Sequence, residues 1–312
     1  MKKFPKCPVC FSYNIKTIRN YRNFSETFKN MKLIKCLDCF LHFSYPMPNE
    51  EMLKKYNENY HMSAHGSQDG ATKLDKVSNA FFKGMAKIRY DYLKGFINKE
   101  TKKNKFNVLE IGPGPGKFLK EMINNHPEFK YFAVETDLSC HEKLNSLGVD
   151  LISIFQIKKF EKLFDLIIVS HVLEHVSNPM NFIGLLKTLL KKNGIMFIEV
   201  PCKDYLFKPF YEPHLLFFDK ISIKKLVKDF KLMKISYHGR LIREIGSLKE
   251  LFFSKLIRIM NILRIPYYHI GNKELKKILK DNFLVNVMIP HKAHIENDDP
   301  SWWLRVVIKK NK

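Results

Sequence analysis

The fold of this 312-residue chain is decided by one stretch, Val108-Leu109-Glu110-Ile111-Gly112-Pro113-Gly114-Pro115-Gly116-Lys117-Phe118-Leu119. Its apolar beginning predicts a buried strand, its glycines a tight loop, and the residues that follow the start of a helix. The three glycines leave out Cβ atoms where backbone must approach a ligand or adopt a positive φ. Nucleotide, dinucleotide and nucleoside binders all use such loops, so the loop alone does not choose among them.

Around this stretch the chain alternates between strands and helices. Strands are expected at 107–111, 131–135, 151–154, 165–170 and 195–200. These are near-continuous apolar runs, as in a parallel sheet that is covered on both faces. The pattern predicts a doubly wound α/β domain whose ligand lies at the carboxyl ends of the strands. The polar residues expected at those ends are Glu110, Glu135, Asp137, Ser170, His171 and Glu199.

Two details of the glycine loop narrow the choice of ligand. The spacing is GxGxG and not GxGxxG, and Glu110 stands directly before the loop. A pyrophosphate would meet a repulsive carboxylate there, so both details favour a nucleoside with a positive charge over a dinucleotide. Glu135 lies one strand–loop–helix–strand step further on, where an acid accepts hydrogen bonds from both ribose hydroxyls.

The amino-terminal residues predict a metal site. Two CxxC pairs, Cys7 with Cys10 and Cys36 with Cys39, flank the residues 11–35. Two such pairs can complete a tetrahedral thiolate shell, and four sulfur ligands leave no open position. We therefore expect a structural Zn²⁺ that stabilises the fold. A redox CxxC is the alternative, but that motif comes singly within a βαβ unit.

Charge and hydropathy limit the class of protein. The formal net charge is +23, from 54 Lys and Arg against 31 Asp and Glu. One interpretation of this charge is that lysines are spread over every solvated face of the protein. The other is that the charge serves to attract a polyanion: RNA, a phosphorylated small molecule or an anionic membrane surface. No stretch approaches the roughly 20 apolar residues of a transmembrane segment. No signal peptide is recognised either, so we expect a cytoplasmic protein with reduced cysteines.

Three parts are expected along the chain. Residues 1–45 form the zinc ribbon, 46–104 a linker and helical lid, and 105–312 the α/β domain with an insertion at about 240–300. Helices are expected at 50–59 and 75–97 from their apolar spacing. The polar loop between them is either a linker or a lid over the pocket. The insertion either adds packing or a dimer contact, or forms a cap that recognises the acceptor.

Several segments resemble class I S-adenosylmethionine-dependent methyltransferases. The stretch 108–116 resembles the first motif of that family, and Val134-Glu135-Thr136-Asp137 its ribose-binding strand end. Residues 164–176, which include Leu173-Glu174-His175, resemble the fourth-strand motif, and 190–201 the loop and fifth strand. The resemblance implies a Rossmann-like seven-stranded sheet with helices on both faces and an antiparallel last strand. Residues 231–237 and 302–310 are the expected sixth and seventh strands.

The resemblance also implies the cofactor and its site. S-adenosylmethionine is expected to be bound by Glu110, Gly112, Gly114, Gly116, Glu135, Thr136, Ser170 and His171. Glu110 is expected to bind the ammonium group of the methionine end, directly or through the loop and water. The family often places a polar adenine contact at Phe155-Gln156, where this sequence has no Asp.

A catalytic base is predicted after the fifth strand. Methyl transfer from a sulfonium is an in-line displacement, so the enzyme aligns acceptor, methyl and sulfur and excludes water. A hydroxyl or carbon-acid acceptor also needs a base, and histidine titrates near working pH. The segment Tyr211-Glu212-Pro213-His214 resembles a histidine-bearing segment of one subgroup. His214 is therefore the predicted base and Glu212 its orienting carboxylate; a purely structural histidine is the alternative.

The zinc ribbon points to the same bacterial subgroup, which includes sugar C-methyltransferases and enzymes of surface-polysaccharide pathways. We therefore predict methyl transfer to a small, anionic, carbohydrate-like acceptor, such as a sugar or nucleotide sugar; the methylated atom and the oligomeric state stay open. An RNA methyltransferase with a zinc recognition module is the less favoured alternative. The second alternative is a non-catalytic zinc-ribbon interaction protein, against which the intact Glu110, glycine loop and Glu135 argue.

Overall fold

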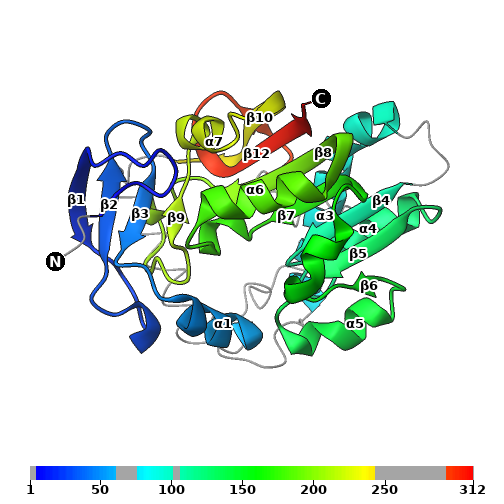
Figure 1. The fold of residues 1–312 in the computed structure, drawn as a ribbon, viewed down its shortest axis with the longest axis horizontal. Helices are drawn as coiled ribbons and strands as arrows, with labels where there is room; N and C mark the ends of the chain where they lie inside the picture. Colours follow the sequence, from blue (N-terminus) through cyan, green and yellow to red (C-terminus); the bar gives the residue numbers. More distant parts are fainter. Residues whose placement is uncertain (1–4, 61–75, 101–105, 243–292, 312) are drawn as a thin grey trace, which may run out of the picture.

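The computed structural model describes residues 5–60, 76–100, 106–242 and 293–311. It contains an eight-stranded sheet with the strand order β11-β10-β12-β8-β7-β4-β5-β6 and a four-stranded sheet with the order β1-β2-β3-β9. The small sheet, with the blue amino-terminal strands, lies beside the large one in Figure 1. The expected polar loop at 61–67 and most of the expected insertion lie outside the described residues.

The large sheet is parallel at its centre and antiparallel at one side. The parallel strands are β4 (Asn107–Ile111), β5 (Lys130–Val134), β6 (Asp150–Leu151), β7 (Phe164–Ser170) and β8 (Leu190–Pro201). β12 (Ser301–Lys310) runs antiparallel between β8 and β10 (Phe230–Leu241). The seven expected strands are therefore present, and the antiparallel last strand confirms the Rossmann-like sheet.

Two details of this sheet differ from the expectation. The third strand covers only Asp150–Leu151 and not 151–154, because the chain turns at Ser153 into the 3₁₀ helix η4 (Ile154–Phe160). An eighth strand, β11 (Glu296–Asn297), pairs with the outer edge of β10. Two residues carry no readable alternation of apolar and polar side chains, so β11 has no signature in the sequence.

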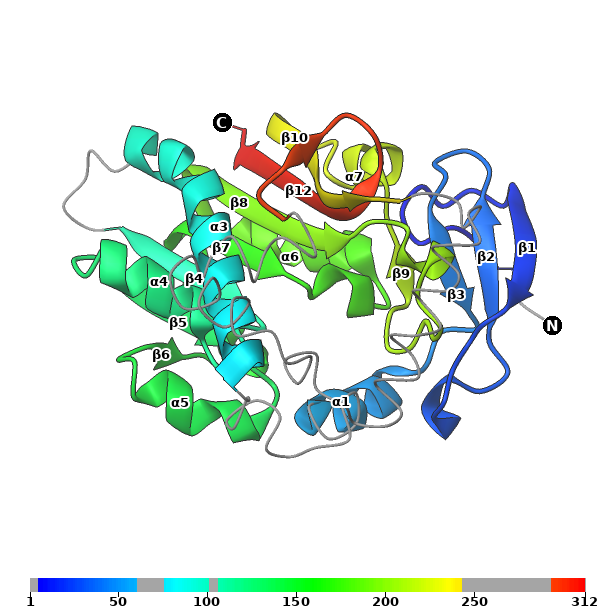
Figure 2. The ribbon, with the colours of Figure 1, turned by 180° about the vertical axis from the view of Figure 1, so that it is seen from behind.

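Helices cover both faces of the large sheet, as predicted. Successive residues of a strand point to opposite faces, so Val108 enters one apolar core and Leu109 the other. The first face packs on α3 (Lys76–Glu100), α4 (Lys117–Asn125) and α5 (His141–Asn145). The second packs on α6 (Pro179–Leu189) and α7 (Lys220–Leu226). α6 lies in front of the sheet in Figure 1, and α3 lies in front in Figure 2, which is seen from behind.

The small sheet takes strands from both sides of the predicted domain boundary. β1 (Ile15–Asn20), β2 (Lys32–Cys36) and β3 (His42–Tyr45) form an antiparallel meander, and the 3₁₀ helix η1 (Glu26–Phe28) lies between β1 and β2. The fourth strand, β9 (Leu216–Phe217), comes from the chain after β8 and pairs antiparallel with β3. The buried residues of this sheet continue into the core of the second face. The division of the chain at residue 45 stays a prediction, and this sheet takes strands from both sides of it.

Helix α1 (Glu50–Glu58) follows the small sheet and lies between it and β6 in Figure 1. The side chain of Asn49 caps the helix by accepting a hydrogen bond from the Met52 N–H at 2.8 Å. Among the helices of the described residues, none has the length and apolar character needed to cross a membrane.

Candidate functional site

The glycine loop joins β4 to α4 in the conformation that glycine permits. Gly112, Gly114 and Gly116 have φ angles of 64°, 54° and 73°, all in the left-handed region. A Cβ on Gly112 would lie 2.6 Å from Cγ2 of Val172, so this glycine lets two loops pack closely. A Cβ on Gly114 would meet nothing within 4 Å, so the backbone there borders open space. An unobstructed backbone at the amino end of a helix suits close approach by a ligand.

Glu135 ties this loop to the neighbouring strand. It follows β5, and its Oε2 accepts a hydrogen bond from the Gly114 N–H at 2.8 Å. Its Oε1 accepts one from the Asp137 N–H, also at 2.8 Å. Burial raises the pKa of the Glu135 carboxyl. Each oxygen has a further lone pair, so the carboxylate can still accept hydrogen bonds from a ribose.

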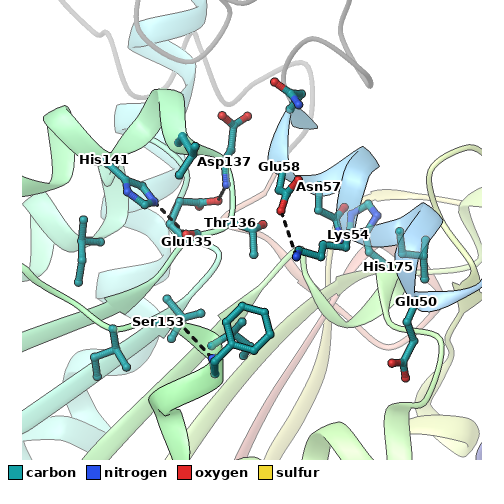
Figure 3. A pocket seen from close by; sticks show the side chains of 18 of the residues that line it. Glu50, Lys54, Asn57, Glu58, Glu135, Thr136, Asp137, His141, Ser153 and His175 are labelled. Carbon is teal, nitrogen blue, oxygen red and sulfur yellow. Dashed lines mark hydrogen bonds and ion pairs between the residues drawn. The ribbon is translucent and has the colours of Figure 1, made fainter.

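A cavity of about 990 Å³ opens beside Glu135. One wall comes from the ends of β5 and β6 and from η4, and includes Glu135, Thr136, Ile152, Ile154 and Phe155. The opposite wall comes from α1, and Figure 3 shows Lys54 and Glu58 facing Glu135 and Thr136 across the cavity. The apolar side chains next to the carboxylate offer a surface for a flat ring. At the position where the family often has a polar adenine contact, the exposed ring of Phe155 lines this wall.

Glu110 is buried beneath the glycine loop. Only 3 % of it is exposed, and its Oε2 has no hydrogen-bond partner in the described part of the chain. Burial raises the pKa of Glu110 to about 8. The positive charge of Arg89 lowers this pKa, and the negative charge of Glu135 raises it further. A buried acceptor without a partner is costly unless a ligand satisfies it. The expected contact of Glu110 with the ammonium group of the cofactor stays a prediction, and Glu110 is not among the residues that line the cavity beside Glu135.

His171 is part of a buried ionic cluster at the end of β7. Glu199 is 0 % exposed, and its oxygens lie 2.6 Å from Nη2 of Arg89 and 2.6 Å from Nε of Arg305. Nε2 of His171 lies 3.1 Å from the same carboxylate, and Nδ1 lies 3.3 Å from Oε1 of Glu174. Burial would lower the pKa of His171, but the two carboxylates raise it overall. The raised pKa means that His171 holds its proton firmly. It is therefore better suited to a positive charge within this cluster than to the role of a general base.

Ser170 lies beside this cluster. Its Oγ is 3.5 Å from Oε1 of Glu199, at the long limit of a hydrogen bond. The predicted cofactor residues therefore form two groups around the carboxyl ends of neighbouring strands. Glu110, the three glycines, Glu135 and Thr136 surround the loop, and Ser170 and His171 end the next strand.

His214 lies in a second polar cluster. It is 6 % exposed, and its Nδ1 lies 2.7 Å from Oδ2 of Asp204. Its ring centroid is 4.9 Å from that of His175, which lines the cavity, and its Nε2 is 4.0 Å from Oε1 of Glu174. Both oxygens of Glu174 are buried, and in the described ranges neither makes a hydrogen bond of good geometry, although Oε1 forms the ion pair with His171. His214 therefore sits one ring behind the cavity wall, against a buried carboxylate.

The prediction that Glu212 orients His214 is wrong. The Glu212 carboxylate points to the connection between β1 and η1, where Oε2 accepts hydrogen bonds from the N–H groups of Phe24 and Ser25 at 3.0 Å. Asp204, in the 3₁₀ helix η6 (Asp204–Leu206), is the carboxylate that contacts His214. Sequence reasoning missed Asp204 because no residue pattern links it to the histidine; a single acid ten positions upstream carries no signal.

The four cysteines of the small sheet come together as predicted. Cys7 and Cys39 have their sulfur atoms 3.4 Å apart, as do Cys10 and Cys36, and all four sulfurs lie within 4.8 Å of one another. Tetrahedral Zn–S bonds of about 2.3 Å require sulfur separations of roughly 3.8 Å. The cluster therefore has the composition and the size of a closed Zn²⁺ site.

Comparison with known proteins gives the class. Residues 82–252, more than half of the chain, match the family described as a methyltransferase domain, and the chain belongs to that family. It is 35 % identical over 187 residues to the ubiquinone biosynthesis O-methyltransferase of Pelagibacter ubique, covering 53 % of this chain and 74 % of that protein. This chain is accordingly an S-adenosylmethionine-dependent methyltransferase, as the motifs predicted.

Solved structures resemble it at low sequence identity. A methyltransferase from Archaeoglobus fulgidus is 17 % identical with a TM-score of 0.45, covering 72 % of this chain and 94 % of that one. The plantazolicin methyltransferase BpumL in complex with SAH is 14 % identical with a TM-score of 0.47, covering 84 % of this chain and 97 % of that one.

Proposed function

We propose that this methyltransferase methylates a hydroxyl of a small, anionic, carbohydrate-like acceptor, such as a sugar or nucleotide sugar of a surface-polysaccharide pathway, with His214 as the base. The observation that carries the proposal is the buried Asp204–His214 pair beside His175, which lines the cavity. A histidine held against a carboxylate is the usual arrangement for removing a proton from an oxygen. The relative named above, an O-methyltransferase, supports oxygen as the acceptor atom.

In this proposal each group of residues has one task. S-adenosylmethionine, when bound, supplies an electrophilic methyl group. Glu135 would accept hydrogen bonds from its ribose, Glu110 would face its ammonium group, and Ile154 with Phe155 would cover its base. Helix α1 would exclude water from this side, because its residues form the wall opposite Glu135. Alignment and exclusion of water are the main demands of an in-line displacement.

The acceptor proton would move to Nε2 of His214. Its Nδ1 must carry hydrogen, because the Asp204 carboxylate can only accept. Nε2 is then the unprotonated nitrogen. Once it takes a proton, the imidazolium would be stabilised by Asp204 on one side and by Glu174 on the other. Burial lowers the pKa of the neighbouring His175 to about 4, so His175 stays neutral and leaves the proton to His214.

The support for an anionic acceptor is the net charge of +23, which attracts anions at long range. The cavity wall itself pairs Lys54 with Glu58 and also includes Glu50, Glu135 and Asp137. The carbohydrate class rests on the resemblance of the ribbon and of the segment 211–214.

The proposal is tested by transfer of a labelled methyl group to a panel of acceptors. Nucleoside diphosphate sugars are expected to be labelled, and neutral sugars much less. His214→Gln should lower the rate by about 10²-fold or more, the usual contribution of a general base. The exposed His294 offers a matched control, since His294→Gln should retain wild-type transfer. Labelling of phenols alone would replace the carbohydrate class, and salt-sensitive labelling of RNA would favour the RNA alternative.

The four cysteines are proposed to hold one structural Zn²⁺. The spacing of their sulfur atoms supports this, and metal analysis of the purified chain gives the test. One zinc per chain is expected, and Cys36→Ser should lose it. A zinc-free chain with unchanged stability would contradict a structural role.

A further inference from the structure

Charged and titratable groups reach His214 from three directions. Asp204 and Lys208 lie on and after η6, at 2.7 Å and 3.5 Å from its ring nitrogens. Glu174 and His175 come from the 3₁₀ helix η5 (Leu173–His175) and face the Nε2 side of the ring. From the end of β1, the hydroxyl of Tyr21 donates a hydrogen bond to the backbone carbonyl of His214 at 2.8 Å, and not to its imidazole ring.

Nζ of Lys208 does not donate a linear hydrogen bond to a ring nitrogen of His214. It is 3.5 Å from both Nδ1 and Nε2. A point equally distant from the two nitrogens lies roughly perpendicular to the lone-pair direction of each, so no linear hydrogen bond forms. Nζ of Lys208 instead lies 3.0 Å from Oδ2 of Asp204. The ammonium group therefore balances the charge of the carboxylate.

Asp204 is held rigidly for contact with the ring. It is 1 % exposed, and its backbone carbonyl accepts hydrogen bonds from the N–H groups of Phe207 at 3.1 Å and Lys208 at 2.9 Å. Its Oδ2 serves both His214 and Lys208, and its Oδ1 has no hydrogen-bond partner among the residues described. Burial disfavours the ionised form, but the charge of Lys208 and the hydrogen bonds from His214 and Lys208 hold the pKa of this carboxyl well below its usual range. Asp204 is therefore a fixed acceptor with a negative charge.

We propose that Asp204 is the positioning residue of the transfer reaction: by accepting the Nδ1 hydrogen of His214, it fixes the tautomer in which Nε2 is free to take the acceptor proton. This inference rests on the proposed role of His214. A histidine in the other tautomer would present N–H instead of a lone pair, and would not act as a base until it reoriented. Asp204 is not among the residues that line the cavity, and its side chain contacts His214 and Lys208, so its effect on the acceptor would pass through His214.

A merely structural role makes a different prediction. If Asp204 served only to neutralise Lys208, then Lys208→Met and Asp204→Ala would disturb His214 in the same way, since each removes one half of the pair. If Asp204 fixes the tautomer, the two changes differ. Asp204→Ala frees Lys208 to donate to Nδ1, whereas Lys208→Met leaves the carboxylate in place.

The test is nitrogen NMR of the full chain labelled with ¹⁵N-histidine at about pH 9, where imidazoles are neutral. His214→Gln identifies the His214 signals. The wild type and Lys208→Met should show the Nδ1–H tautomer, and Asp204→Ala should shift to Nε2–H. Glu212→Gln is the control: its carboxylate is buried two positions from His214, but bonds to the connection between β1 and η1, so the tautomer should not change.

Two results would overturn the inference. One is an unchanged Nδ1–H tautomer in Asp204→Ala, and the other is the same change in Lys208→Met. Asp204→Asn covers the case that Asp204→Ala does not fold, since a neutral amide is a weaker acceptor and should give a mixture of tautomers. A pure Nδ1–H tautomer in that variant would also contradict the inference. The readout needs no acceptor, so its failure is separate from failure of methyl transfer in His214→Gln.

Discussion

Binding of S-adenosylmethionine should release a proton from Glu110. The pKa of this buried carboxyl is raised to about 8, so at pH 7 about nine-tenths of the free protein carries the proton. If the ammonium group of the cofactor binds the carboxylate, the complex holds the ionised form. About 0.9 proton should therefore leave per cofactor bound at pH 7. Titration calorimetry in buffers of different ionisation enthalpy measures this number directly.

The affinity should depend on pH by an amount that follows from the same value. Ionising Glu110 costs about 1.4 kcal/mol at pH 7 and about 2.7 kcal/mol at pH 6, at 1.36 kcal/mol for each pH unit below about 8. A buried hydrogen bond between charged groups contributes about 3 kcal/mol. The net gain is then about 1.6 kcal/mol at pH 7 and close to zero at pH 6.

Glu110→Gln isolates this effect. The variant should bind the cofactor roughly 15-fold more weakly than the wild type at pH 7 and about equally at pH 6, as the net gains above require. The α-amino group of the cofactor stays protonated below about pH 7, and His171 is present in both proteins, so neither distorts the comparison. Equal proton release from wild type and variant, or a constant affinity ratio across this range, would refute the assigned contact.

Three further outcomes are expected. Without cofactor, Glu110→Gln should raise the free energy of unfolding above pH 8. The protonated Glu110 contributes its full stability below about pH 4.5, and this contribution is lost as the pH rises to about 8. Denaturant titrations at pH 5 and pH 9 check this. Removal of zinc by a chelator, or Cys36→Ser, should lower the thermal midpoint by roughly 10 °C and methyl transfer with it, while calorimetry still detects cofactor binding. Gly112→Ala should lower the free energy of unfolding by at least about 1–2 kcal/mol in denaturant titrations, because a Cβ at positive φ costs that much and would press on Val172. Gly95→Ala, with open space around it on α3, should instead gain up to about 1 kcal/mol of stability.

The central sheet was predictable because its signals are local. Four strands, β4, β5, β7 and β8, are buried apolar runs over most of their length, and the glycines at 112, 114 and 116 adopt the positive φ angles that their positions suggested. The cysteine pairs were predictable for the same reason, since each CxxC forms its own turn. Where an element depends on a distant partner, as β11 does on β10, two residues hold too little pattern to be recognised.

The acceptor side of the site was harder to predict. His214 follows from a motif, but its carboxylate partner was assigned to the nearest acid in the sequence. Glu212 and His214 are separated by one residue, but the Glu212 carboxylate bonds to the N–H groups of Phe24 and Ser25, whereas the His214 ring contacts Asp204. Arg89 and Arg305, which hold Glu199, are likewise brought together from α3 and β12. Such contacts are set by the packing of distant elements, which no short stretch encodes.

The pairing of β9 with β3 bears on how this enzyme can be made and altered. Until residue 217 leaves the ribosome, β3 has an open edge, and the N–H groups of Phe24 and Ser25 lack their acceptor, Glu212. The nascent ribbon is thus incomplete while most of the large sheet is being synthesised. For the same reason a chimaera that exchanges only residues 1–45 would pair a foreign β3 with the original β9. Exchange of 1–45 jointly with 211–218 keeps the partners matched and transfers the histidine along with the ribbon.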